Sequence, residues 1–314
     1  MNGDRVAFVR ATEVWVPSSD GSHLSLASGQ YGPLTAFADA AERTNFSIGE
    51  GLPGRAWELG YPIVFHELKQ PLFVRETAAA EAGLTCGVAI PIVKGDETKA
   101  VLVLFCGDDA THVGAIEIWH APEDTPDLAL HDGYFGTADR FEFQSRHISF
   151  RKGFGLPGMA WENKAPIVMG DLGRTKKFIR RGNAGEAGIT RGVGIPLATR
   201  TKGTWILAIL SALGTPIARR MEVWNVTGGN RATFVDGLCE SGADLGNVYE
   251  GVEIGPGETA IGRALRDGVP TLSDSVDLEA RAVAASCTAA KLSRMVAVPI
   301  FEGEQMTSIV VWYN

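Results

Sequence analysis

The chain has 314 residues, of which 45% are hydrophobic and 21% are charged, as in ordinary globular proteins. Its formal net charge of −8 at pH 7 argues against a nucleic-acid-binding surface, and its apolar runs are too short to cross a membrane. The four cysteines have no metal-ligand spacing and the start lacks a signal-peptide pattern, so we expect a cytoplasmic protein without a metal site.

The chain contains one sequence pattern three times, at a spacing of about 104 residues. Residues 49–57 read GEGLPGRAW, residues 153–161 read GFGLPGMAW, and residues 257–265 read GETAIGRAL. A Glu-x-Trp triplet recurs in step with this motif. Because such a period is the length of a small globular domain, we predict three tandem domains.

The predicted domains, called repeats 1, 2 and 3 below, cover residues 1–110, 111–215 and 216–314. Repeat 3 has lost the proline and the tryptophan of the motif, so we expect it to be degenerate.

Each repeat predicts strands and short helices in the same order. In repeat 1, a hairpin precedes a helix, the glycine-rich motif opens a second short helix, and a strand, a third helix and a final hairpin follow. The strands of repeat 1 are predicted at 11–17, 23–27, 62–66, 87–93 and 99–106. Those of repeat 2 are predicted at 116–120, 128–131, 166–170, 192–198 and 204–210. Those of repeat 3 are predicted at 221–226, 232–236, 270–273, 296–301 and 306–313. This order predicts an α+β fold, with a mostly antiparallel sheet of five or six strands and short helices over one face.

The motifs of repeat 1 resemble the core signature of GAF domains. Residues 46–64 read FSIGEGLPGRAWELGYPIV, and Phe73-x-Arg75 and the strand around Ile90-Pro91 follow. Repeat 2 carries the same set, with Phe178-x-Arg180, and repeat 3 carries it more weakly. The resemblance implies a six-stranded sheet in each repeat and a pocket under the inserted helices that senses small molecules or chromophores, usually without catalysis.

The pocket implied by this resemblance would be lined by residues of the repeated motifs. A helix that starts at the glycine-rich turn presents free N–H groups to an anion, and an arginine can grip a carboxylate or phosphate with two hydrogen bonds. The alternatives are a surface arginine lying over an aromatic ring and tryptophans that only fill the core. The candidate ligand-binding residues are Gly51, Trp57, Phe73, Arg75, Cys86, Gly155, Trp161, Phe178, Arg180 and Arg191.

Four more specific chemistries fit the sequence poorly. The letters G-x-G-x-x-G match a dinucleotide fingerprint, but Gly60 ends the following helix within two turns. Cys86 lacks the neighbouring histidine and the Asp-Ile-Pro run expected of a tetrapyrrole site. The cysteines are not clustered as in the methionine sulfoxide reductase branch of the family, and no Ser/His/Asp constellation stands out. We therefore expect no enzymatic activity, and the sequence names no cofactor.

Two functional hypotheses remain open. The first is a sensory or small-molecule-binding protein that passes a signal to a partner protein or through self-association, without contacts to nucleic acid or membrane. The second is a structural or assembly protein built from GAF folds that have lost their ligands. Co-purified small molecules would distinguish the two.

The repeats also lack the flanking helices that usually cover the back of a GAF sheet. The linker between repeats 1 and 2 is short and not helical in composition. Because alternate residues of a strand share a face, we expect the three tryptophans of the Glu-x-Trp triplets to stand on the uncovered face. We predict that the repeats pack sheet to sheet with rough threefold pseudo-symmetry, or form a dimer, through Trp15, Trp119 and Trp224.

Overall fold

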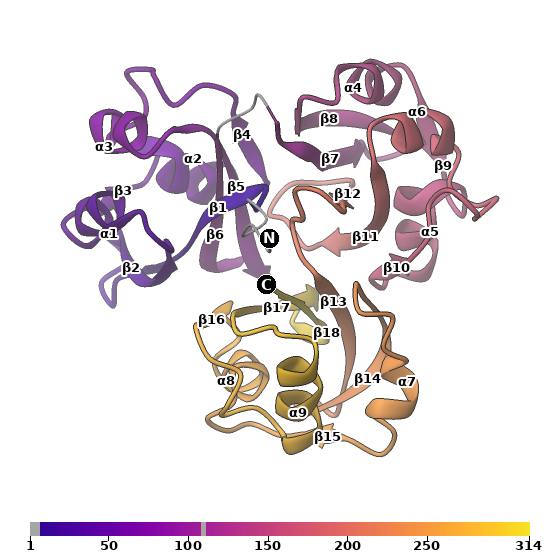
Figure 1. Cartoon of the computed structure of the whole chain (residues 1–314). Coiled ribbons are helices and arrows are strands. Elements are labelled where there is room, and N and C mark those ends of the chain that lie inside the picture. The colour runs from indigo at the N-terminus through magenta and orange to yellow at the C-terminus, as the bar shows by residue number, and fades with distance from the viewer. Residues whose placement is uncertain (1–6, 108–110) are drawn as a thin grey trace.

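The computed structural model describes residues 7–107 and 111–314. They form three lobes arranged around a common centre, each built on a six-stranded antiparallel sheet with short helices (Figure 1). The predicted α+β fold, with short helices and mostly antiparallel sheets, is confirmed. Among the described helices, none has the length and apolar character needed to cross a bilayer.

The three repeats have the same order of elements. Repeat 1 contains β1 (Val9–Pro17), β2 (His23–Gln30), α1 (Thr35–Glu42), β3 (Phe46–Ser47), α2 (Gly51–Leu59), β4 (Ile63–Phe65), α3 (Glu76–Glu81), β5 (Leu84–Lys94) and β6 (Glu97–Gly107). Repeat 2 contains β7 (Val113–Ala121), β8 (Asp127–Gly136), α4 (Asp139–Arg146), β9 (Ser149–Arg151), α5 (Gly155–Asn163), β10 (Ile167–Met169), α6 (Arg181–Glu186), β11 (Ile189–Leu197) and β12 (Thr204–Ala212). Repeat 3 contains β13 (Arg220–Thr227), β14 (Arg231–Cys239), α7 (Leu245–Val248), β15 (Glu253–Ile254), α8 (Ala260–Asp267), β16 (Thr271–Ser273), α9 (Arg281–Ala289), β17 (Met295–Glu302) and β18 (Gln305–Tyr313).

The strand order is also shared. It is β3-β2-β1-β6-β5-β4 in repeat 1, and the corresponding strands follow the same order in repeats 2 and 3. The first and last strands of each repeat, which begin and end its chain segment, therefore pair in the middle of its sheet.

The glycine-rich motif is a tight turn that brings α2 against the sheet, where it packs mainly on β5 and β6. Gly49 and Gly51 have φ values of 79° and 58°, which a side chain rarely allows. A Cβ atom at Gly54 would lie 2.2 Å from the carbonyl oxygen of Ser47. The helix ends at Gly60 in the left-handed conformation. The glycines thus serve chain geometry.

Each of repeats 1 and 2 encloses its own core between the sheet and the helices. In repeat 1 this core contains Trp15, Phe37, Leu52 and Phe105, all fully buried. In repeat 2 the matching cluster contains Trp119, Phe141 and other buried residues. The interior of both repeats is therefore packed largely with aromatic and aliphatic side chains.

A third core joins the opposite faces of the sheets. It contains Val14 and Val88 from repeat 1 and Ile118 and Ile209 from repeat 2, and it continues into the core of repeat 3. This shared core buries the faces that flanking helices would otherwise cover. Neighbouring repeats consequently cover one another.

Three equivalent contacts close the repeats into a ring. The edge strand β4 of repeat 1 packs against β8 of repeat 2, β10 of repeat 2 against β14 of repeat 3, and β16 of repeat 3 against β2 of repeat 1. Pro91, Pro196 and Pro299, which are equivalent in sequence, line one small cavity at the centre. A head-to-tail contact that returns to its starting point after three steps generates threefold pseudo-symmetry.

The tryptophans of the Glu-x-Trp triplets do not make these contacts between repeats. Trp15, Trp119 and Trp224 are fully buried, and each lies inside its own repeat against aromatic residues of that repeat. The assignment of faces made from the sequence is therefore reversed, and the residues next to them, such as Val14, face the neighbouring repeats. A hydrogen bond explains why the tryptophans face inward. Each indole N–H donates to the glutamate of its triplet, and that glutamate lies inside the repeat.

Shortening a side chain in the shared core should destabilise the protein. We expect Ile118→Ala to lower the free energy of unfolding by ~2–5 kcal/mol, because it leaves a cavity between repeats, and Ile118→Val by only ~0.5–1.5 kcal/mol. Chemical denaturation measures both. Val235→Ala, at an exposed position of β14, is the control and should change the free energy of unfolding by about 0.5 kcal/mol or less. An Ile118→Ala effect no larger than this control would contradict the shared core.

Candidate functional site

A buried carboxylate lies in the interior of repeat 1. Glu13 is fully buried and receives two parallel hydrogen bonds from Arg75, at 2.6 Å from Nη1 to Oε1 and 2.7 Å from Nη2 to Oε2. Trp15 Nε1 donates to the same carboxylate at 2.8 Å, and Tyr31 donates its hydroxyl proton at 3.1 Å. The carboxylate is therefore paired by one cation and two neutral donors, as a buried charge requires.

Repeat 2 contains the same arrangement with one exchange. Arg180 binds both oxygens of Glu117, and Trp119 Nε1 donates to Oε2 at 2.9 Å. The place of the tyrosine is taken by Ser145 of α4, whose hydroxyl donates to Glu117 at 3.1 Å. Arg180 and Glu117 are fully buried, so water does not compete for this pair.

Repeat 3 keeps the carboxylate but takes its arginine from another place. Glu222 accepts hydrogen bonds from Trp224, Tyr249 and Tyr313 at 2.8–2.9 Å. Arg220, on the same strand, lies 3.6 Å from Glu222 and bonds Tyr249 at 2.9 Å. Burial raises the pKa of Glu222 above its ordinary value, despite the hydrogen bonds from these donors.

An internal exchange explains this difference. In repeats 1 and 2 the arginine is the N-cap of the helix that precedes the final hairpin, and alanine stands two residues before the glutamate, at Ala11 and Ala115. In repeat 3 the helix N-cap is Ala280 and the residue two before Glu222 is Arg220. All three repeats thus place one arginine in the interior.

Aromatic rings surround the interior guanidinium groups. The Cζ atom of Arg75 lies 4.5 Å from the ring centre of Phe37 and within 6 Å of four other rings, including Phe73. Arg180 has the corresponding neighbours, with Phe141 at 4.5 Å and Phe178 at 5.4 Å. A guanidinium over aromatic faces gains cation–π attraction, which is stronger when water is excluded.

The interior arginines are thus not at a pocket rim. The sequence hypothesis gave Arg75 and Arg180 an external anion, whereas the structure places the protein's own glutamate on both guanidinium groups. The aromatic residues of Phe-x-Arg are brought to the same interior and pack there. Sequence reasoning noted that the triplet glutamate recurs in all three repeats, but it did not assign its partner.

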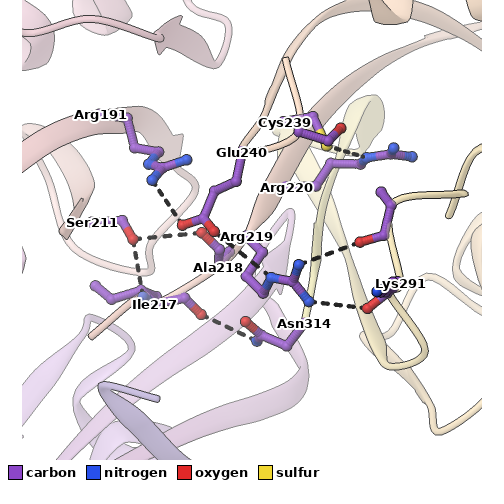
Figure 2. A network of polar contacts seen from close by, with 12 residues as sticks. Arg191, Ser211, Ile217, Ala218, Arg219, Arg220, Cys239, Glu240, Lys291 and Asn314 are labelled. Carbon is purple, nitrogen blue, oxygen red and sulfur yellow. Dashed lines mark hydrogen bonds and ion pairs between the residues drawn. The ribbon is translucent and has the colours of Figure 1, made fainter. Parts of the chain in front are cut away.

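The other candidates are spread over different parts of the molecule. Gly51 and Gly155 are the first residues of α2 and α5, and Trp57 belongs to the core of repeat 1. Cys86 is fully buried in the shared core, away from the interior of repeat 1. Arg191 pairs with Glu240 of repeat 3, with Nη2 2.8 Å from Oε1 (Figure 2).

Trp161 lines a cleft between repeats 2 and 3. The cleft has a volume of about 220 Å³ and an apolar floor made by Leu197, Ile300 and Phe301. Lys152 and Lys164 stand at its side, and Lys164 reaches across the cleft to Glu302 of repeat 3 at 2.5 Å. The sequence did not point to this cleft, because it forms only where two repeats meet.

Trp205 connects this cleft to the contact between repeats 1 and 2. Its side chain is 3% exposed, and its indole N–H has no hydrogen-bond partner among the described residues. Tyr61 of repeat 1 and His120 stack on it, with ring centres 4.9 and 4.0 Å away. A buried N–H without a partner is uncommon in native proteins and marks a place where an acceptor is missing.

A histidine–aspartate pair crosses the contact between repeats 1 and 2. His66 Nε2 lies 2.8 Å from Asp132 Oδ1, and this hydrogen bond raises the pKa of His66 above its ordinary value. Burial lowers the pKa of the nearby His131. The pKa values of the two histidines are therefore shifted in opposite directions.

Breaking one interior ion pair should cost far more stability than breaking a surface pair. We expect Arg180→Met to lower the free energy of unfolding by ~3–5 kcal/mol, because it leaves Glu117 charged and unpaired in the core. Adding Glu117→Gln should recover part of this loss, so the double variant should be less destabilised than the sum of the single ones. Chemical denaturation provides the values. Arg140→Met, which removes an exposed ion pair with Glu186, is the control. It should lower the free energy of unfolding by only ~0–1 kcal/mol. If the free-energy changes of Arg180→Met and Glu117→Gln simply added up in the double variant, the two side chains would not interact and the interior ion pair would be contradicted.

The pairing of His66 with Asp132 between repeats 1 and 2 should be stronger in mild acid. Because the folded-state pKa of His66 is raised, its pairing with Asp132 stabilises the protein fully below the unfolded pKa of 6.5, and this stabilisation is lost as pH rises through the folded pKa. We expect His66→Gln to cost ~0.5 kcal/mol at pH 5.5, the range for a partly exposed pair, and less at pH 8.5. Urea denaturation at both pH values checks this, and Asp132→Asn should show the same trend. A His66→Gln cost that grows toward pH 8.5 would contradict the pairing.

Comparisons with known proteins give structural likenesses only. No model of a known protein family matches the sequence, and no curated protein matches it. Among solved structures, the chain is similar to the GAF domain of A. aeolicus nlh2 (23% identity, 32% of this chain and 58% of that chain, TM-score 0.26). It is also similar to the GAF domain of a phosphoenolpyruvate-protein phosphotransferase from Coxiella burnetii (21% identity, 33% and 60%, TM-score 0.27). Each match spans about one repeat and somewhat more than half of the other chain.

One likeness corrects an expectation. The chain is also similar to a free methionine-R-sulfoxide reductase from Neisseria meningitidis (18% identity, 31% and 51%, TM-score 0.24), which is an enzyme. The expectation of no enzymatic activity, drawn from the absence of a catalytic constellation in the sequence, is therefore not sustained. At such identities the likenesses concern the fold alone. The strand order that all three sheets share shows that the chain consists of three tandem repeats of one fold, and this fold is similar to that of GAF domains.

Proposed function

We propose that this protein is a small-molecule-binding sensory protein whose ligand site is the cleft between repeats 2 and 3. The fold is one found in sensory and ligand-binding domains. The observation that carries the proposal is the cleft itself, where two lysines, two tryptophans and an apolar floor surround about 220 Å³. Ligand sites of this kind are concave, mostly apolar and equipped with a few polar groups.

The lining of the cleft favours a small organic anion. Lys152 and Lys164 supply positive charge, while Trp161, Leu197 and Phe301 accept an aromatic or aliphatic body. A carboxylate on the ligand would attract the lysine ammonium groups, and its apolar part would leave water. A monocarboxylate with an aromatic or short aliphatic body meets both requirements.

The position of the cleft suits a sensor because its walls belong to different repeats. Lys164 of repeat 2 and Glu302 of repeat 3 form an exposed ion pair across it. An anionic ligand competes with Glu302 for Lys164, and so changes how the two repeats are held together. We propose that a partner protein in the cytoplasm, or a second copy of the chain, senses this change.

The alternative is a structural or assembly protein, and the interior of the repeats supports it. In repeats 1 and 2 the arginines under the helices are occupied by glutamates of the same repeat. Under this alternative the cleft would be a packing defect between repeats, and no small molecule would use it.

Binding of carboxylates distinguishes the two. We expect benzoate or hexanoate, as probes, to raise the melting temperature and to quench the fluorescence of Trp161 and Trp205. Lys152→Gln should weaken this binding roughly tenfold, since a hydrogen bond to a charged group contributes ~1.5 kcal/mol. Lys176→Gln removes the same charge from an exposed loop of repeat 2 and should leave binding unchanged.

A second variant tests Trp205, which also lines the cleft. Trp205→Phe keeps a ring but removes the unpartnered N–H, so it should weaken binding while retaining the fold. If the probes neither bind nor shift the melting temperature, and native mass spectrometry finds no co-purified compound, the structural alternative holds. Equal weakening by both lysine variants would indicate a general charge effect and not a site.

A further inference from the structure

Repeat 3 brings two thiols to one buried guanidinium. Arg220 Nε lies 3.3 Å from the Sγ atom of Cys239, and its Nη1 lies 3.4 Å from the Sγ atom of Cys287. Cys239 ends β14 directly opposite Arg220 in the sheet, and Cys287 lies on α9. In repeats 1 and 2 the corresponding donors bond glutamate carboxylates. The exchange that moved the arginine to β13 therefore turned it toward sulfur.

The electrostatics separate the two thiols. Burial opposes ionisation of Cys239, but hydrogen bonds from Ser241 at 3.1 Å and from Arg220 outweigh it and lower the pKa of this thiol below 9.0. Burial raises the pKa of Cys287 to about 12. Since the thiolate is the nucleophile, Cys239 is the activated sulfur and Cys287 stays protonated.

Solvent exposure also favours Cys239 over Cys287 as the reactive thiol. Cys239 is partly exposed, whereas Cys287 is fully buried. Ser241, the partner of Cys239, and Ser286, a partner of Arg220, line an open hollow whose other lining residues are mostly alanines, three of them in α9. The hydroxyl oxygen of Ser286 also accepts a hydrogen bond from Arg220 Nη2 at 3.0 Å. The guanidinium therefore lies just behind this hollow. A small oxidant can reach the surroundings of Cys239.

We propose that Cys239 is a site of oxidative modification by small hydroperoxides. Its thiolate attacks one peroxide oxygen, so an S–O bond forms and the O–O bond breaks. Sulfur is oxidised by two electrons to a sulfenic acid, and the leaving hydroxide or alkoxide takes a proton from water to become water or an alcohol. Arg220 and Ser241 hold the attacking sulfur in its anionic form.

The residue next to this site links repeats 2 and 3. Glu240 pairs with Arg191 of repeat 2 and lies 3.7 Å from Arg219, and the hydrogen bond between Arg220 and Cys239 lies beside this network (Figure 2). Oxidation of Cys239 adds an oxygen atom one residue away from the ion pair that ties the repeats. The inference is independent of the ligand cleft, because it rests on repeat 3 alone.

The test is chemical labelling of the reduced, full-length chain at pH 7. After brief treatment with hydrogen peroxide and dimedone, mass spectrometry should find the sulfenic-acid adduct at Cys239, and iodoacetamide should alkylate Cys239 at least ~100-fold faster than Cys287. This ratio follows from the difference in thiolate fraction, a factor of ten for each unit of pKa. In urea, all four cysteines should react at similar rates, which provides the reference.

Two serine variants separate activation from exposure. Ser241→Ala removes a hydrogen bond to Cys239 and should slow its alkylation and its oxidation roughly threefold to tenfold at pH 7. Ser275→Ala, in an exposed turn of the same repeat, should leave both rates unchanged. The proposal is overturned if Cys239 in the folded protein reacts no faster than in urea, if the adduct forms mainly on another cysteine, or if Ser241→Ala has no effect.

Discussion

A buried glutamate is the constraint around which each repeat is organised. A carboxylate inside a protein is tolerated only with a cation and hydrogen-bond donors on its oxygens. Glu13, Glu117 and Glu222 each receive an indole N–H from the tryptophan two residues later, which fixes that tryptophan inside the repeat. With the tryptophans inside, the opposite face of each sheet is left apolar and must be covered by the neighbouring repeats.

The same constraint explains how the repeats diverged. Repeats 1 and 2 bring the cation from a helix N-cap, and the guanidinium fork closes fully on the carboxylate. In repeat 3 the arginine comes from the strand, and two tyrosines donate hydrogen bonds to Glu222 in its place. Several N–H groups of the guanidinium are therefore available for other acceptors. Those donors reach Cys239, Cys287 and Ser286. A change in where one arginine is attached thus converts a structural pair into a different chemical environment.

Much of the fold could be predicted from the sequence, because repetition reveals domains and glycines reveal turns. The motif around Gly51 and Gly54 correctly placed a short helix after a tight turn. The face of Trp15 could not be predicted, since alternation along a strand defines two faces but not which one is inside. The partner of Glu13 is 62 residues away, and the cleft beside Trp161 needs two repeats, so neither is visible in a local pattern.

The closed ring of repeats has a consequence for assembly. A trimer of separate subunits dissociates on dilution and must use the same residues at every contact, because its subunits are identical. Here covalent connection removes both restrictions. One junction carries His66 and Asp132, the next carries Lys164 and Glu302, and the third uses Gln30 bonded to the backbone of Ser273. A single gene product can therefore hold three junctions of different chemistry at any concentration, each free to evolve its own response.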